Sequence, residues 1–195
     1  MQMIKCAGKN KIFEALVITL FLVLAGSQGA AAEGLSLYVE NDSRGIKPNG
    51  NTDRHYTHGT RLVYLLQPDW SWLQDFAAWD AADGQTVDTA VGFFVGQHIY
   101  TPDHVSDPAR RRAEDRVFAG WLYTGVFAQR ATDDRLEHLE LNVGVIGPSS
   151  LAEDSQRCIH EYMDSDDPEG WDEQLDDEPA ADVTWMRQQR LRDGW

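Results

Sequence analysis

The chain has few cysteines and few basic residues, and each shortage excludes a class of protein. Its 195 residues contain only two cysteines, Cys6 and Cys158. A scaffold held together by several disulfides is therefore excluded. Lys and Arg number 17 against 32 Asp and Glu, for a formal net charge of −15. We expect no nucleic-acid partner, because such binding needs clustered positive charge, whereas an acidic chain suits divalent cations.

Several familiar catalytic motifs are also missing. The sequence contains no Gly-x-Ser-x-Gly, Cys-x-x-Cys or His-Glu-x-x-His motif and no phosphate-binding loop. These absences exclude the usual serine-hydrolase, structural-zinc, zincin and nucleotide-binding interpretations. An acidic segment at 164–178 resembles a calcium loop in composition, but Pro168 and Glu169 occupy positions where an EF-hand needs a ligand and a glycine. A solvated acidic loop is the simpler interpretation.

The one long apolar run lies at the N-terminus. A basic start with three lysines precedes an apolar stretch at 15–25 and a small-residue site at 30–32. This pattern predicts a cleaved secretory signal peptide at 1–32, since a spanning helix would need roughly 20 apolar residues. The remaining residues, 33–195, are long enough for one domain. Removing the signal takes away a net charge of +2, which leaves −17, and removes Cys6, so Cys158 has no intramolecular disulfide partner.

Short segments that alternate between apolar and polar residues dominate the rest of the chain. They predict strands near 35–40, 60–66, 89–100, 120–129 and 138–145, and a weaker one near 183–190. The fold class is therefore all-β. Alternation fits a soluble sheet as well as a membrane barrel, but the signal peptide and the aromatic residues near the strand ends favour an antiparallel transmembrane β-barrel. About six strands are fewer than the eight or so of the smallest single-chain bacterial barrels.

Polar residues at two places are candidates for a site. Asn41 and Asp42 end the first strand and offer an amide and a carboxylate to a cation or an oxyanion, although the same pair often simply opens a turn. A short helix after Gly147-Pro148 carries His160, and Asp166 follows six residues later. This histidine is a candidate general base oriented by a carboxylate; a structural role is the alternative.

Two further expectations concern the local structure around these candidates. Ser150 and Glu153 fit a capping box for the helix, which would place Gln156 and His160 together on its more polar face. The three arginines at 110–112 form the densest basic run of residues 33–195. They suit either a grip on phosphate groups or a solvated loop.

Taken in order, the motifs resemble those of the outer-membrane lipid A 3′-O-deacylase family. The matching pieces are Glu40-Asn41-Asp42, Tyr56-Thr57-x-Gly59, Gln97-x-Ile99-Tyr100-x-Pro102, Asp115-Arg116, Gly144-Val145-Ile146-Gly147-Pro148, Gln156 with His160, and Trp171-x-x-Gln174. The resemblance implies a twelve-stranded barrel in the outer membrane. It also implies a calcium-dependent site near the outer mouth that hydrolyses the ester holding the 3′-linked acyloxyacyl chain of lipid A. Lipid A or lipopolysaccharide would be the partner.

The resemblance assigns a role to five residues. His160 matches the catalytic histidine, which would deprotonate water, and Thr57 matches the site hydroxyl. Asn41 and Asp42 match the strand-end pair, in which the Asn41 amide would stabilise the oxyanion and Asp42 would hold calcium. Asp166 stands where the family can have a glutamate. Its carboxylate would either orient His160 or bind the metal.

The chain ends near its sixth strand, whereas the family continues for a further half barrel. We therefore expect residues 33–195 to be the N-terminal half of the barrel and the chain to be a fragment, without the closed wall that positions the site. Two other functions stay open. One is a non-catalytic outer-membrane barrel or surface protein, and the other is a soluble periplasmic β-domain that binds an acyl or saccharide ligand.

Overall fold

The structure is a computed structural model that describes residues 33–41, 55–81, 84–111 and 113–191. The strands are β1 (Glu33–Asn41), β2 (His58–Leu66), β3 (Asp88–Tyr100), β4 (Ala119–Ala131), β5 (Arg135–Ile146) and β6 (Glu178–Gln189). Within the described residues, the connections between the strands contain two α-helices, α3 (Ser71–Ala77) and α4 (Ala152–Met163), and three 3₁₀ helices, η1 (Pro108–Arg110), η2 (Pro148–Ser150) and η3 (Trp171–Glu173). The predicted signal peptide falls outside the described residues.

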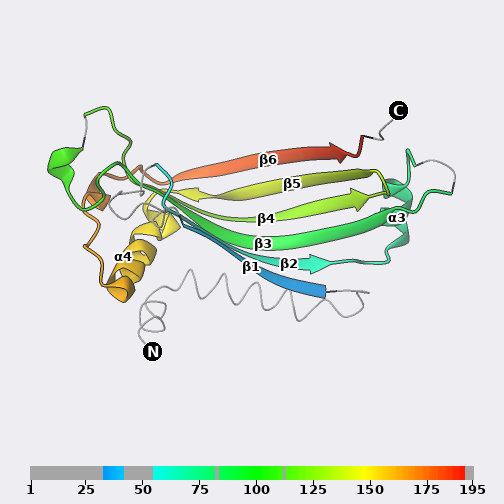
Figure 1. Cartoon of the computed structure of the whole chain (residues 1–195), viewed down its shortest axis with the longest axis horizontal. Helices are drawn as coiled ribbons and strands as arrows, with labels where there is room; N and C mark the ends of the chain where they lie inside the picture. Colours follow the sequence, from blue (N-terminus) through cyan, green and yellow to red (C-terminus); the bar gives the residue numbers. More distant parts are fainter. Residues whose placement is uncertain (1–32, 42–54, 82–83, 112, 192–195) are drawn as a thin grey trace.

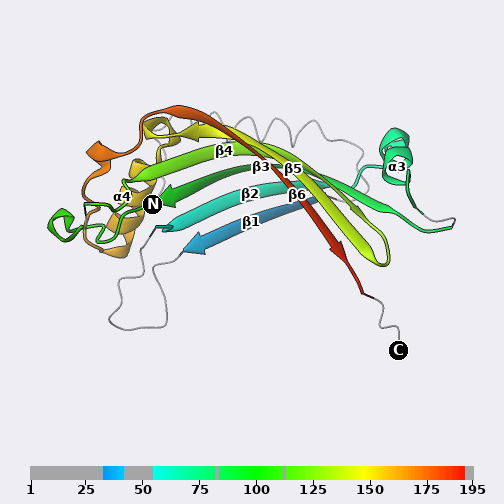
Figure 2. The same cartoon turned by 90° about the horizontal axis from the view of Figure 1, so that it is seen from above.

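The strands form one curved antiparallel sheet in chain order (Figures 1 and 2). Each strand pairs with its neighbour in the sequence, and within the described residues β1 and β6 remain the two edges of an open sheet. The predicted antiparallel all-β fold is confirmed. All the expected strands are present, and β6 begins at Glu178, earlier than the predicted start near residue 183. No helix in the described segments is long and apolar enough to cross a membrane.

One face of the sheet carries apolar side chains that are exposed. The register places Leu141 of β5 opposite Val126 of β4 and Val183 of β6, so that the three point to the same side. Their exposed fractions are 45%, 45% and 68%. Residues of the same face on β1 and on the rest of β5 are also exposed: Leu35, Leu37, Val39, Leu139 and Val143. Exposed apolar side chains on one face are what a sheet presents to lipid.

The opposite face carries a polar network. Arg61 Nη2 lies 2.6 Å from Glu140 Oε2, and the Arg61 guanidinium lies 3.6 Å from the centroid of the Phe94 ring. The Asn142 amide donates to Glu140 over 3.0 Å and to Asp182 over 2.8 Å. These hydrogen bonds satisfy the Glu140 carboxylate, which is largely removed from water. Apolar residues outward and polar residues inward is the alternation of a membrane barrel wall.

Aromatic rings on the polar face lie over glycines of the neighbouring strand. The Tyr123 ring of β4 covers Gly96 of β3 so closely that a Cβ at Gly96 would lie 2.4 Å from Tyr123 Cζ. Phe94, Phe127 and Tyr123 are buried in one cluster on this face. The glycine is therefore required by close packing, because any side chain there would displace the ring.

The two ends of the sheet differ. The connections β1–β2, β3–β4 and β5–β6 lie at one end with α4, and the connections β2–β3 and β4–β5 lie at the other end with α3 (Figure 1). The β4–β5 connection consists of only residues 132–134. Bacterial outer-membrane barrels have short turns on the periplasmic side and longer loops outside. The β4–β5 turn favours the periplasmic side for the end with α3, although the β2–β3 connection at that end, residues 67–87, is long. We call this end the periplasmic end and the end with α4 the outer end.

Candidate active site

The helix α4 begins with a strained turn after β5. Gly147 has φ of 104°, a conformation that favours glycine, and Pro148 then starts η2. Leu151 is the N-cap residue of α4, with φ of 61° and no side-chain capping hydrogen bond. The predicted capping box is wrong, because the Ser150 hydroxyl donates to the Gly147 carbonyl over 2.5 Å. That hydrogen bond stabilises the turn before the helix.

The start of α4 packs against the ends of β3 and β4. Ala152 lies in a buried cluster with Ile99 of β3, and with Val105, Phe118 and Trp171 from the loops. The Gln97 side chain donates to the Ser150 carbonyl over 2.7 Å, which fixes the turn to β3. The helix is therefore held on the apolar side of the sheet at its outer end.

The buried face of α4 carries Gln156. This side chain is 2% exposed, and its Oε1 accepts a hydrogen bond of 2.8 Å from the Trp171 indole N–H. Within the described residues the Gln156 Nε2 has no hydrogen-bond partner. Ala152, Gln156 and His160 are spaced by four residues and so share one side of the helix. The prediction that Gln156 lies on the more polar face is wrong, because Trp171 of η3 packs over this side and pairs with the amide.

His160 is half-buried, and one nitrogen of its imidazole ring already makes a hydrogen bond. Its Nδ1 lies 2.5 Å from the main-chain oxygen of Asp166. A carbonyl oxygen only accepts hydrogen bonds, so Nδ1 must carry the proton. In the neutral imidazole this leaves the lone pair on Nε2, which is the form that accepts a proton from water. The backbone conformation at Asp164, with φ of 53°, ends the helix and turns the chain back toward His160.

The other predicted site residues are placed as follows. Thr57 is buried, and its hydroxyl oxygen lies 2.6 Å from that of Thr101. Its N–H donates to the carbonyl of Ile99, whose side chain supports α4, so Thr57 and α4 share one end of β3. Asn41 is the last residue of β1 and pairs with His58, the residue after Thr57. The carboxylate of Asp166 is exposed, and Asp42 lies outside the described residues.

The sequence did not identify the role of Arg111. Its guanidinium donates to the carbonyls of His104 and Val105 over 3.2 and 2.8 Å, and also to the carbonyl of Glu169. It lies 5.2 Å from the centroid of the Phe118 ring. Arg111 therefore connects the β3–β4 loop to the α4–β6 loop, which carries Asp166. Arg111 hydrogen-bonds to backbone carbonyls, so its role is neither the grip on phosphate nor the solvated loop considered for the arginine run at 110–112.

Hydrogen bonds to carboxylates strengthen the same end of the sheet. The Tyr56 hydroxyl donates to Glu40 over 2.9 Å. Burial, followed by this hydrogen bond, raises the pKa of the Tyr56 phenol, which therefore stays a donor at neutral pH. Ser149 donates to Asp177 through its hydroxyl over 2.6 Å and its N–H over 2.7 Å, and these bonds lower the pKa of the Asp177 carboxyl. The start of β6 is thereby tied to η2.

Calcium is the cofactor that the resemblance in sequence implies for this site. No group of three or more His, Cys, Asp or Glu side chains within the described segments is arranged to hold a metal ion. Of the two predicted metal ligands, Asp42 lies outside those segments and Asp166 has an exposed carboxylate. Carboxylate oxygens are the ligands that calcium prefers, so the donor chemistry fits this ion.

The curved sheet, its apolar and polar faces, and the histidine-bearing helix at its rim define a wall of a membrane β-barrel with a candidate hydrolytic site. The sequence profile of outer membrane protein LpxR matches residues 13–195, and the chain belongs to this family. This finding confirms the family predicted from the motifs, and it places the chain among outer-membrane proteins.

The structure is similar to that of LpxR from Salmonella typhimurium. The TM-score is 0.60 and the sequence identity 23%, over 80% of this chain and 50% of that chain. The chain thus spans about half the length of that structure, and the likeness concerns the fold. No curated protein matches the chain significantly.

Replacing Trp171 with phenylalanine is expected to loosen α4. The Gln156 amide would lose its donor, and leaving a buried amide without partners costs about 1–3 kcal/mol. Hydrogen exchange of the α4 amides should accelerate accordingly. The double variant Trp171→Phe, Gln156→Met removes the unpaired amide and should recover most of the protection. Equal exchange in the single and double variants would contradict this assignment.

Proposed function

We propose that this protein takes part in lipid A deacylation, as a hydrolase that removes the 3′-linked acyloxyacyl chain at the outer rim of an outer-membrane barrel. The observation that carries this proposal is the state of His160. Its Nδ1–H is held by the Asp166 carbonyl, so Nε2 is the basic nitrogen. Family membership supports the same conclusion, because the histidine lies within the matched residues.

The reaction needs one proton shuttle. Nε2 of His160 takes a proton from water as the water oxygen bonds to the ester carbonyl carbon. The tetrahedral intermediate then collapses, the bond between the carbonyl carbon and the sugar oxygen breaks, and the imidazolium returns its proton to that oxygen. The products are a free acyloxyacyl fatty acid, still carrying its secondary acyl chain, and a sugar hydroxyl. The hydrogen bond from Nδ1 to the Asp166 carbonyl holds the orientation of the ring during both steps.

The remaining site residues would bind and orient. The Asn41 amide would donate a hydrogen bond to the oxyanion. The Thr57 hydroxyl would hold in place the polar groups next to the oxyanion. Asp42 and Asp166 would hold calcium, which when bound polarises the ester carbonyl. The Asp166 carbonyl and carboxylate would thus act on different partners.

Mass spectrometry of lipid A tests the function. The protein is expressed in a host whose lipid A carries the 3′ acyloxyacyl chain, and lipid A is extracted from isolated outer membranes. We expect a lipid A species that lacks this group. Chelation of calcium in the isolated membranes should stop this species from accumulating further. An unchanged lipid profile, with the protein folded in the outer membrane, would instead indicate a non-catalytic barrel or surface protein.

A further inference from the structure

The helix α3 presents aromatic side chains to the outside of the molecule. Trp72, Phe76 and Trp79 have exposed fractions of 64%, 72% and 72%. Trp72 and Phe76 are four residues apart and so lie on one side of the helix, beside the buried pair Leu73 and Ala77, and Trp79 follows in the turn after the helix. The helix and the turn after it therefore have more apolar surface than contact with the sheet requires. An exposed surface of this kind indicates a binding partner.

A further ring extends this surface. Trp70, the N-cap residue of α3, stacks on Trp72 with ring centroids 5.8 Å apart and an angle of 15° between the planes. It is also exposed. We call Trp70, Trp72, Phe76 and Trp79 the aromatic surface.

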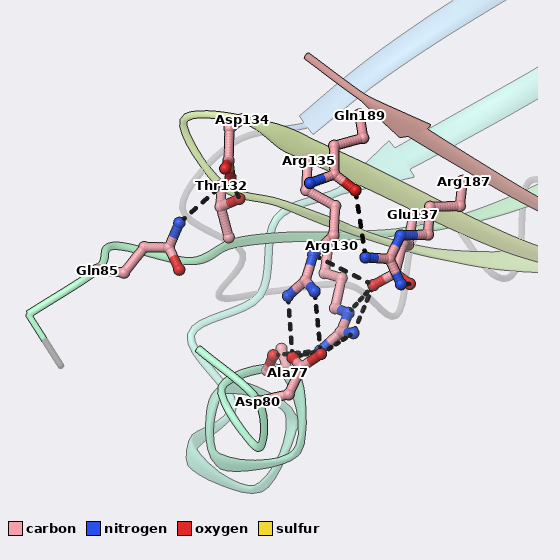
Figure 3. Close-up of polar contacts among 10 residues, drawn as sticks. All are labelled: Ala77, Asp80, Gln85, Arg130, Thr132, Asp134, Arg135, Glu137, Arg187 and Gln189. Carbon is pink, nitrogen blue, oxygen red and sulfur yellow. Dashed lines mark hydrogen bonds and ion pairs between the residues drawn. The ribbon is translucent and has the colours of Figure 1, made fainter. Parts of the chain in front are cut away.

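The aromatic surface is fixed to the sheet by ion pairs. Arg130 of β4 and Arg135 of β5 both bind the carboxylate of Asp80, over 2.7 and 2.9 Å, just after the helix (Figure 3). Arg130 also donates to the Ala77 carbonyl over 2.9 Å, and its guanidinium lies 5.7 Å from the centroid of the Trp79 ring. The hydrogen bonds from Arg130 in particular lower the pKa of the Asp80 carboxyl. The rings are thus carried by a segment with defined orientation.

The ion pairs lie at the edge of the apolar band, by which we mean the exposed apolar residues on the outward face of the sheet. In the register, Arg130 is opposite Glu137, and Glu137 is opposite Arg187, so these charged residues form one row across three strands. The next row toward the centre of the sheet on the same face contains Ala128, Leu139 and Trp185. The charged row is therefore where the surface changes from apolar to ionic, as at a membrane interface.

The helix lies at this same level and on this same face. Gln74 of α3 donates to Thr89 of β3 over 3.0 Å, and Thr89 is opposite Arg130 in the charged row. Figure 1 shows α3 at the end of the sheet away from α4, beside the short β4–β5 turn. The aromatic surface lies beside the charged row, on the face of the sheet that carries the apolar band, and at the periplasmic rim. Trp side chains favour this depth because their rings are apolar and their N–H is polar.

We propose that α3 is a membrane-interface anchor whose aromatic surface inserts among the phospholipids of the periplasmic leaflet. The helix lies along the bilayer surface, with its rings about 5–10 Å into the boundary between headgroups and acyl chains. The Asp80 ion pairs hold the helix at that depth. The anchor fixes the height of the barrel wall in the bilayer, and it is independent of hydrolysis.

A fluorescent probe on α3 tests this anchor. The full chain, with Cys6→Ser and Cys158→Ser, receives a single cysteine by Phe76→Cys, is labelled with an environment-sensitive dye, and is reconstituted in vesicles of phosphatidylethanolamine and phosphatidylglycerol. Asp75→Cys, exposed on the same helix but off the aromatic surface, is the matched control. We expect acyl-brominated phospholipids to quench the Phe76 probe at least about twofold more than the Asp75 probe, because only the first is inserted.

Two results would overturn the anchor. Equal quenching at the two positions would mean that the aromatic surface faces water in the vesicles. This result is expected if a periplasmic protein, absent from the vesicles, covers that surface in the cell. The second result is a Phe76 probe that is shielded from water but is not quenched by brominated lipid. If this shielding decreases when the protein is diluted in the vesicles, a second copy of the chain covers the aromatic surface. If the Phe76→Cys chain does not fold, Trp72→Cys reports from the same surface one turn earlier.

Discussion

Replacing His160 with alanine is expected to lower the rate of 3′-ester hydrolysis by about 10²- to 10⁴-fold, the range that general acid–base catalysis contributes. The reason is the assignment of protons on the ring. Nδ1 donates a hydrogen bond to the Asp166 carbonyl 2.5 Å away, so Nε2 is the base that the proposed reaction uses. Rates are measured as release of fatty acid from lipid A by outer membranes containing each variant.

A second substitution separates the base from its structural hydrogen bond. In His160→Asn the side-chain amide can still donate to the Asp166 carbonyl but has no basic nitrogen. We expect this variant to be as slow as His160→Ala while protecting α4 against hydrogen exchange like the unmodified protein. Asp154→Asn is the control, because Asp154 is exposed on the first turn of the same helix. Substantial hydrolysis by His160→Asn would show that the histidine has a structural role only.

The strands could be predicted because their physical signal is local. Apolar residues at every second position must share one face, so Leu139, Leu141 and Val143 indicated β5 without any knowledge of its neighbours. The pairing of adjacent strands then follows from short connections. β6 was the least accurate, because its first residues include Glu178 and Pro179, which have low strand propensity, and pairing with β5 overrides that preference.

The packing of α4 and the existence of α3 could not be predicted in the same way. Gln156 is buried because Trp171, fifteen residues later, supplies both cover and a hydrogen bond. No periodicity within the helix contains that information. The aromatic residues that follow β2 favour a membrane interface near a strand end, but they do not indicate a helix. A seven-residue helix is too short for a clear periodic pattern.

Replacing Gly120 with valine is expected to displace α4 from the sheet and to lower hydrolysis by about 10²-fold, the cost of moving a catalytic group by roughly 1 Å. A Cβ at Gly120 of β4 would lie 2.1 Å from Ser150 Oγ and 2.2 Å from Ala152 Cβ. Neither neighbour can retreat easily. The Ser150 hydroxyl is bonded to Gly147, and Ala152 is packed against the buried cluster at the start of α4.

Gly34→Val provides the matched control for this close approach. Gly34 is also a strand glycine, but the nearest atom to its Cβ position is Leu65 Cβ at 3.9 Å, an ordinary contact. Gly34→Val should therefore leave both hydrolysis and α4 protection unchanged. In Gly120→Val we expect faster proteolysis between β5 and β6 while the sheet retains its heat-modifiable migration in gels. If both variants hydrolyse lipid A equally well, the contact of α4 with β4 does not position His160.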